Sequence, residues 1–177
     1  AECEPYITGD HRTCLERPEQ VIKGATLLAK CFGVDKVYIG IEANKQNAAD
    51  VLNAKIAELN APVVVEVLHT RYPQGAEKQL VQAVSGRQVP SGGLPIQGGV
   101  IVMNVATCAA VADAVIDGKP LVERIVTVTG AVREPANLRL RIGTITEDII
   151  GECGGFSGDV GKVIFGGAMT GMCAPNT

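Results

Sequence analysis

Apolar and polar residues follow one another along the first two thirds of the chain in blocks of two kinds. Some blocks are short and continuously apolar, as in buried strands, whereas others repeat their apolar residues at helical spacing. After a polar opening over residues 1–14, the pattern predicts a helix at 16–32, a strand at 36–41, a helix at 44–59, a strand at 63–68, a helix at 75–86, a strand at 100–103 and a helix at 104–117. Such alternation is typical of an α/β fold with a mostly parallel sheet flanked by helices.

The pattern changes near Lys119. Thr144 and Glu147 have the spacing of a capping box at the start of a short helix. Around that helix, apolar and polar residues alternate as in strands with one solvent-exposed face. The predicted elements are strands at 121–129 and 138–142, the helix at 145–153 and a strand at 162–165. We therefore expect two domains, an α/β domain over residues 1–118 and a small α+β domain over residues 119–177.

The stretch from residue 72 to residue 107 holds two predicted helix starts, at Gly75 and Asn104, joined by a connector rich in glycine and proline. Helix N-termini present unpaired N–H groups and the positive end of the helix dipole, so they suit a phosphate or another anion. In an open parallel sheet both starts would lie beyond the carboxyl ends of the strands, where ligands bind. An ordinary surface connection would explain the same composition.

Composition narrows the range of partners. The chain of 177 residues carries a net charge of −3, has a pI of about 5.4, and contains 3% aromatic residues with no tryptophan. An acidic protein poor in aromatic residues suits neither a nucleic acid nor an anionic membrane surface. No run approaches the roughly 18 apolar residues of a membrane-spanning helix. We expect no nucleic-acid partner and no direct membrane insertion.

The reactive side chains point to no familiar site. The six cysteines include no C-x-x-C pair, which leaves metal and iron–sulfur spacing absent. Asp10, His11 and Arg12 could form an acid–base cluster, but no nucleophile motif accompanies them. Neither G-x-G-x-x-G nor a P-loop occurs. Glu2 and Glu4 share a face if their segment is extended, although a solvated acidic segment is the simpler interpretation of those two residues alone.

Five longer motifs carry a specific resemblance. They are Glu-Cys-Glu-Pro-Tyr-Ile-Thr at residues 2–8, Tyr-Pro-Gln-Gly-Ala-Glu-Lys-Gln-Leu at 72–80, Asn-Val-Ala-Thr at 104–107, Val-Thr-Val-Thr-Gly at 126–130 and Gly-Lys-Val-Ile-Phe-Gly-Gly-Ala-Met-Thr-Gly at 161–171. Together they resemble the C subunit of Rnf electron-transport complexes, the ion-translocating ferredoxin:NAD oxidoreductases. The chain is also similar to microcompartment cobalamin reductases and to the 51-kDa flavin subunit of complex I.

The resemblance implies a complex I 51-kDa-like FMN domain over residues 1–118, followed by a β-grasp, soluble-ligand-binding (SLBB) domain. It implies FMN and NADH as cofactors, 4Fe–4S clusters elsewhere in the parent protein, and neither a metal ligand nor a catalytic acid or base in this chain. It assigns nine residues to the flavin and the nucleotide. Glu2 and Cys3 would lie along the flavin, and Glu4 would face the nicotinamide nucleotide. Gly75, Ala76 and Glu77 would lie beside the isoalloxazine ring, and Asn104, Val105 and Thr107 near the ribityl phosphate. Ala76 stands where the complex I turn has a carboxylate.

By the same comparison, the family's glycine-rich flavin loop precedes Glu2 and its cluster-binding motifs follow residue 177. The resemblance thus implies an internal fragment that alone is inactive and binds FMN weakly or not at all. The parent would oxidise NADH through FMN in a peripheral, cytoplasmic subunit at the inner face of the membrane, with membrane and soluble subunits as partners. Alternatives are a piece of a cobalamin reductase, a non-catalytic docking module, or a domain pair for another soluble ligand.

Overall fold

The computed structural model describes residues 1–174, and these divide into two compact units. Unit 1 consists of Ala1–Cys3 and Asp10–Pro120, and unit 2 of Glu4–Gly9 and the chain from Leu121 on. The sequence places a boundary after residue 118 and assigns the whole opening segment to the first domain. In the structure, Glu4–Gly9 instead belong to unit 2.

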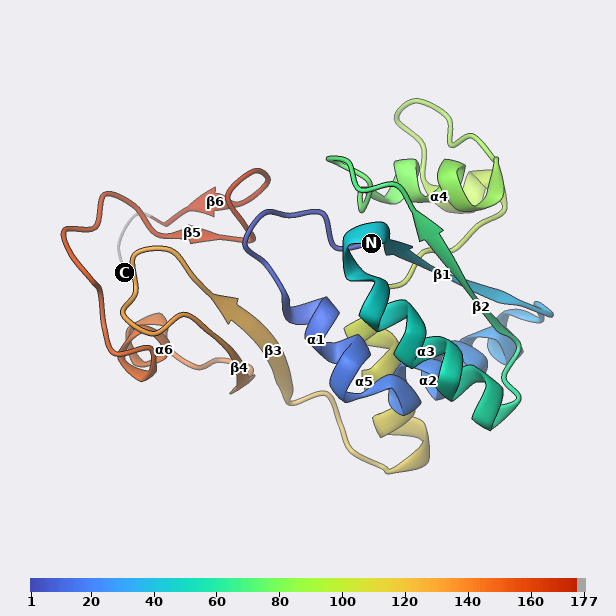
Figure 1. Cartoon of the computed structure of the whole chain (residues 1–177), viewed down its shortest axis with the longest axis horizontal. Coiled ribbons are helices and arrows are strands. Elements are labelled where there is room, and N and C mark those ends of the chain that lie inside the picture. The colour runs from blue at the N-terminus through green and yellow to red at the C-terminus, as the bar shows by residue number, and fades with distance from the viewer. Residues whose placement is uncertain (175–177) are drawn as a thin grey trace. The chain divides into compact units, whose positions relative to one another are not determined.

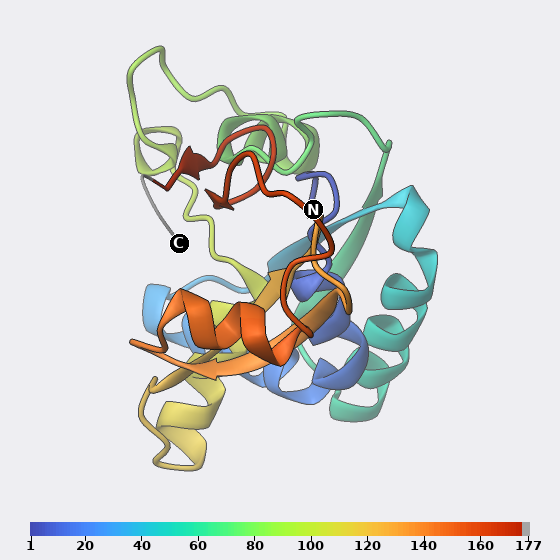
Figure 2. The ribbon, with the colours of Figure 1, turned by 90° about the vertical axis from the view of Figure 1, so that its left-hand side faces the viewer.

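Unit 1 is an α/β layer structure with a parallel pair of strands, as the sequence predicts. Its elements are α1 (Gly9–Glu16), α2 (Pro18–Phe32), β1 (Val37–Glu42), the 3-10 turn η1 (Ala43–Lys45), α3 (Gln46–Leu59), β2 (Val63–Leu68), α4 (Glu77–Ser85), the 3-10 turn η2 (Pro95–Gly98) and α5 (Val105–Ile116). β1 and β2 pair in register from Val37 opposite Val63. Figures 1 and 2 show this sheet between α4 on one side and α2 and α3 on the other.

The core of unit 1 lies between that sheet and its helices. Val21 and Ile22 of α2 are fully buried, as is Leu52 of α3, and they pack with Ile39 and Ile41 of β1. Five such side chains removed from water contribute roughly 1.5–3 kcal/mol each to folding. The fold class inferred from the strand–helix alternation is confirmed.

Helices α2 and α5 cross closely at Gly24. A Cβ atom at Gly24 would overlap the backbone carbonyl oxygen of Cys108 in α5. Arg17, just before α2, binds Asp113 of α5 through two hydrogen bonds of 2.6 and 2.8 Å. These contacts fix α5 on α2 and so determine where α5 begins.

Unit 2 is a small α+β structure. Its elements are β3 (Glu123–Val128), β4 (Ala136–Arg141), α6 (Thr146–Glu152), β5 (Ile164–Phe165) and β6 (Met172–Cys173). β3 and β4 form an antiparallel hairpin, and Figure 2 shows α6 lying over one of its faces. Thr8 joins this hairpin, because its amide donates to the Thr127 hydroxyl and its own hydroxyl accepts from Asn137.

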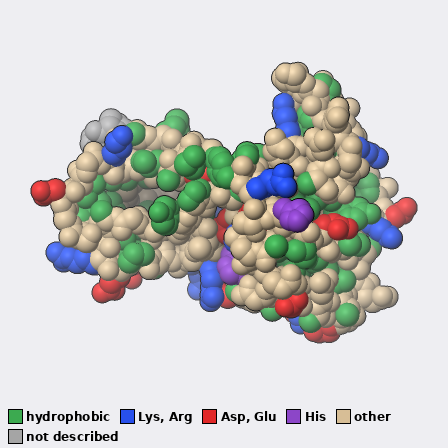
Figure 3. Space-filling model, turned by 45° about the horizontal axis from the view of Figure 1, so that its top comes forward, with side chains coloured by type: hydrophobic (Ala, Val, Ile, Leu, Met, Phe, Trp, Pro, Cys, Tyr) green, Lys and Arg blue, Asp and Glu red, His purple; other side chains and the backbone are tan. Residues whose placement is uncertain are grey.

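Apolar side chains also reach the surface, as the green atoms in Figure 3 show. Leu94 and Ile96 are exposed on the connector between α4 and α5, and Ile164, Phe165 and Met172 on the β5–β6 hairpin. Over residues 1–174, no helix combines the length and the apolar content that crossing a membrane requires.

One predicted strand is absent, one observed helix is not predicted, and one predicted helix cap is wrong. Residues 100–103 are not a strand: they run as irregular chain into α5, and no neighbouring strand offers them a hydrogen-bond ladder. The polar opening contains a helix, α1, that its sequence pattern does not reveal. Thr144 does not cap α6, since its hydroxyl donates to the Arg141 carbonyl oxygen at 2.7 Å and Ile145 takes the capping position.

Candidate functional site

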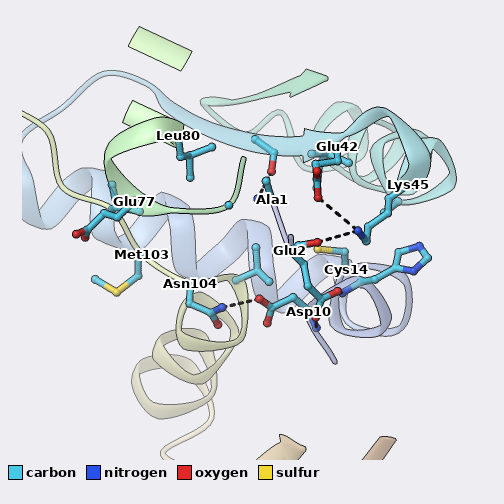
Figure 4. A pocket seen from close by; sticks show the side chains of 17 residues that line it. Ala1, Glu2, Asp10, Cys14, Glu42, Lys45, Glu77, Leu80, Met103 and Asn104 are labelled. Atoms are coloured by element: carbon cyan, nitrogen blue, oxygen red, sulfur yellow. Dashed lines mark hydrogen bonds and ion pairs between the residues drawn. The ribbon is translucent and has the colours of Figure 1, made fainter. Parts of the chain in front are cut away.

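A pocket of about 240 Å³ opens in unit 1 at the carboxyl end of β1. Figure 4 shows its wall, built from the opening residues, α1, the end of β1, η1, the start of α4 and the start of α5. Pockets that enclose a whole drug-sized ligand measure roughly 300–1,000 Å³. This one is large enough for part of a nucleotide.

The opening segment forms one wall because it is tied to β1 and to the turn before α4. The Ala1 nitrogen donates to the Gly40 carbonyl oxygen at 2.7 Å. On the other side, a Cβ atom at Gly75 would overlap the Ala1 carbonyl oxygen and lie 3.0 Å from the Cys3 sulfur. Glycine is therefore required at position 75 by a close backbone approach within the protein itself.

Glu2 holds the start of α1 in place. Its two carboxylate oxygens accept hydrogen bonds from the backbone N–H groups of Asp10 and His11, at 2.9 and 3.1 Å. Both N–H groups lie in the first turn of α1, where they have no partner within the helix. Burial raises the pKa of Glu2 above its ordinary value, because the loss of hydration outweighs these two hydrogen bonds, which favour the carboxylate.

The floor of the pocket contains a buried ion pair. Glu42, the last residue of β1, is 2% exposed, and its carboxylate lies 3.6 Å from the Lys45 ammonium. The same ammonium donates to the Glu2 carbonyl oxygen at 2.9 Å. Lys45 therefore links the end of β1 to the opening segment.

At the opposite side, Asn104 caps α5 with both ends of its amide engaged. Its Oδ1 accepts from the Ala106 N–H at 2.8 Å, and its Nδ2 donates to the Asp10 carboxylate at 2.6 Å (Figure 4). Between this pair and β1 the wall is apolar, with side chains of Ile41, Leu80 and Met103. The pocket thus joins an apolar surface to polar groups, an arrangement common in cofactor sites.

Five of the nine residues that the resemblance assigns to the cofactors line this pocket: Glu2, Gly75, Glu77, Asn104 and Val105. Cys3 and Ala76 lie beside Gly75 in the chain or in space, and Thr107 lies in the first turn of α5, but these three do not line it. Glu4 belongs to unit 2, where its carboxylate accepts from the Met169 N–H at 2.6 Å and from the Thr170 hydroxyl at 3.2 Å. These assignments remain predictions.

The sequence-based assignment omits several side chains of the wall: Asp10, Glu42, Lys45, Leu80 and Met103. One signal could have revealed the ion pair, because Glu42 ends an apolar strand and Lys45 follows three residues later. Asp10 stands out in the sequence only as part of a possible acid–base cluster. In the structure His11 turns to Asn47, at 2.9 Å, whereas Asp10 binds Asn104.

The cysteine that lines the pocket, Cys14, is not a nucleophile. Cys14 lines the pocket but is 2% exposed, and burial raises its pKa to about 12. Cys108, within α5, has its pKa raised by burial to about 11. Both stay neutral thiols near pH 7, so they act as small apolar side chains. Among residues 1–174 no cluster of side chains has the composition of a metal site.

Glu2→Gln should change how stability depends on pH. A carboxyl whose pKa is raised on folding stabilises the folded state below its ordinary value, 4.5 for Glu2, and that contribution is lost as pH rises through the folded pKa. Glutamine does not titrate. We expect the free energy of unfolding of Glu2→Gln, relative to the unchanged chain, to rise from pH 4 to pH 7 in urea denaturation.

Glu19→Gln is a control of opposite sign. The hydrogen bond from Lys23 lowers the pKa of Glu19, so its contribution is present above 4.5 and is lost as pH falls. Relative to the unchanged chain, Glu19→Gln should therefore become less stable as pH rises. If both variants shift in the same direction, the Glu2 assignment is wrong.

The residues present suit the uncharged part of FMN better than its phosphate. Leu80 and Met103 offer an apolar surface for the ring. The charged side chains of the wall, however, are four carboxylates against one lysine: Glu2, Asp10, Glu42, Glu77 and Lys45. A flavin ring and its hydroxylated chain fit this surface, whereas a phosphate dianion would meet like charges.

The sequence of this chain matches two domain families and is similar to subunits of known electron-transfer complexes. Residues 1–113 match the model of the Nuo51 FMN-binding domain family, and residues 125–172 match that of the SLBB domain family. The C subunit of the Na⁺-translocating ferredoxin:NAD⁺ oxidoreductase complex of Acetobacterium woodii is 48% identical over 97% of this chain and 39% of its own length. The C subunit of the proton-translocating ferredoxin:NAD⁺ oxidoreductase complex of Clostridium ljungdahlii is 46% identical over 99% of this chain and 38% of its own.

The resemblance to Rnf C subunits is therefore confirmed, although the chain spans under two fifths of the length of these two relatives. Among solved structures, an NAD⁺-reducing [NiFe]-hydrogenase in its H₂-reduced state superposes with a TM-score of 0.76 at 20% identity, over 91% of this chain and 32% of that one. Its air-oxidised state gives a TM-score of 0.74. These structures show a shared fold.

Proposed function

Because this chain belongs to the Nuo51 FMN-binding domain family, we propose that it is the flavin-carrying part of a peripheral electron-transfer subunit. The protein containing it would oxidise NADH through FMN and pass the electrons to 4Fe–4S clusters held outside this chain. It would do so in an ion-translocating complex, at the inner, cytoplasmic face of the membrane, with membrane and soluble subunits as partners. The observation that carries the proposal is the pocket, which five family-assigned residues line.

The chain's own residues seat the flavin and shield it. Leu80 and Met103 would pack against the ring. Asn104 and Asp10 would meet its hydroxyl groups. When bound, FMN supplies the chemistry, accepting a hydride and releasing electrons one at a time. Lys45 and Glu2 hold the wall in shape, and no side chain needs to move a proton.

Met103→Glu tests this assignment. Met103 lines the pocket and is 40% exposed, so the new carboxylate needs no buried space but adds charge beside the ring. We expect the longest natural polypeptide containing these residues to purify with a flavin absorption band that NADH bleaches. The substitution should lower the flavin content at least about tenfold, since each tenfold loss needs only about 1.4 kcal/mol.

Ile96→Glu is the matched control, because Ile96 is 63% exposed on the connector and does not line the pocket. Its flavin content should equal that of the unchanged protein. A protein with no flavin band, or one whose band does not respond to NADH, would refute the proposed function. A stable complex with a membrane subunit that forms without flavin or NADH would then favour a docking module.

A further inference from the structure

The resemblance places the ribityl phosphate near the start of α5, and in the structure a carboxylate already lies there. The Asp10 carboxylate accepts a hydrogen bond from Asn104 Nδ2 at 2.6 Å, and Asn104 Oδ1 accepts one from the Ala106 N–H. The positive end of a helix dipole attracts negative charge. The Asp10 carboxylate already supplies a negative charge beside the start of α5.

The rest of the wall reinforces the same preference. Lys45 is the cation among the charged wall residues, and its ammonium is committed to Glu42 and to the Glu2 carbonyl oxygen. Glu77 stands in the first turn of α4, so this second helix start carries its own acidic residue as well. A phosphate entering the pocket would find both helix starts matched to carboxylates and no uncommitted lysine on the described wall.

We propose that Asp10 is a specificity-determining residue that acts together with Asn104. With this pair in place, uncharged polar groups, such as the hydroxyls of the flavin side chain, can bind at the start of α5, whereas the Asp10 carboxylate repels a phosphate. This inference rests on the proposed function and deepens it: the uncharged head of the flavin enters the pocket, and the phosphate stays outside. Asp10 also fixes the orientation of the Asn104 amide, because it accepts hydrogen bonds only from the NH₂ end.

Backbone amide NMR of the full 177-residue chain tests the proposal with riboflavin, FMN and inorganic phosphate as probes. In the unchanged chain, riboflavin should shift the Val105 and Ala106 amide signals, and phosphate at equal concentration should leave them in place. In Asp10→Asn, phosphate should shift them. The affinity for FMN relative to riboflavin should rise about fivefold, the effect of one charge at a helix start.

Two further variants separate charge at this place from charge in general. Asp50→Asn removes one carboxylate from the exposed side of α3, where Asp50 accepts from Gln46, and should behave as the unchanged chain. The exchange Asp10→Asn with Asn104→Asp keeps the hydrogen-bonded pair and places the carboxylate on the cap itself. It should exclude phosphate again, and it also reports on folding if Asp10→Asn alone is unstable.

The outcomes distinguish this inference from the proposed function. If phosphate shifts the Val105 and Ala106 signals in the unchanged chain, or if folded Asp10→Asn and Asp50→Asn give the same response, the role of Asp10 is refuted whatever the flavins do. If neither riboflavin nor FMN shifts any signal from the pocket while the phosphate results hold, the flavin assignment fails and the exclusion of phosphate by Asp10 stands.

Discussion

Gly24→Ala is expected to destabilise unit 1 by at least about 2 kcal/mol, although alanine is the better helix former by about 1 kcal/mol. The added Cβ would overlap the Cys108 carbonyl oxygen in α5, and a backbone atom cannot rotate away. The two helices would have to separate, which opens the packing around Val21 and Ala109. Urea unfolding followed by far-ultraviolet circular dichroism measures the loss.

Gly151→Ala provides the control for helix propensity. Gly151 lies in α6 with an ordinary backbone conformation, and no heavy atom lies within 4 Å of the place a Cβ would take. This variant should be neutral or slightly more stable. Separation of α2 from α5 would also move Asn104, so Gly24→Ala should reduce flavin content as well. Equal stability of the two alanine variants would show that α2 and α5 do not need their close crossing.

The sequence predicts those elements of unit 1 whose apolar residues face the core at regular spacing. The strand at 63–68 has the bounds that its apolar run indicates, and the helix predicted from residue 16 ends at Phe32 as expected but begins at Pro18. Helix α1 escapes prediction because only Thr13 and Cys14 are buried in it, and the carboxylate that satisfies its first turn comes from Glu2, outside the helix. Its stability depends on a contact that no local pattern encodes.

Residues 100–103 illustrate the opposite error. Four consecutive apolar residues resemble a buried strand, but Ile101 is 46% exposed and Met103 40%. An apolar run can equally line a pocket, as Val102 and Met103 do here. Periodicity reports that a segment avoids water, and it does not report whether another strand, a helix or a ligand provides the cover.

For the site, helix starts and motifs locate residues by type, and tertiary structure decides their tasks. The resemblance puts Glu2 along the flavin, yet its carboxylate faces the first turn of α1. Asn104 caps a helix, as the sequence predicts, but its pairing with Asp10 joins residues 94 positions apart. A pairing between residues so far apart arises from the fold and could not be read from spacing alone, whereas Lys45 and Glu42 are three residues apart and their pairing has a local signal in the sequence.

Lys45→Met should cost unit 1 about 3 kcal/mol, because it leaves a buried carboxylate without its cation. Methionine keeps most of the apolar stem and removes the ammonium, so the loss measures charge rather than volume. Glu42 remains 2% exposed at the end of β1, and the Glu2 carbonyl oxygen also loses its donor. The midpoint of urea unfolding reports the change, with an unchanged slope as the sign of a simple loss of stability.

Lys55→Met separates burial from ion pairing as such. Lys55 and Glu58 are also a lysine–glutamate pair three residues apart, at 2.7 Å, but the Glu58 side chain is 62% exposed. Water replaces the lost partner there, so this variant should cost far less stability than Lys45→Met. Adding Glu42→Gln to Lys45→Met should recover part of the loss, because the uncompensated charge is then gone. Equal costs for Lys45→Met and Lys55→Met would mean that water reaches Glu42, and that the floor of the pocket is wet rather than closed by an ion pair.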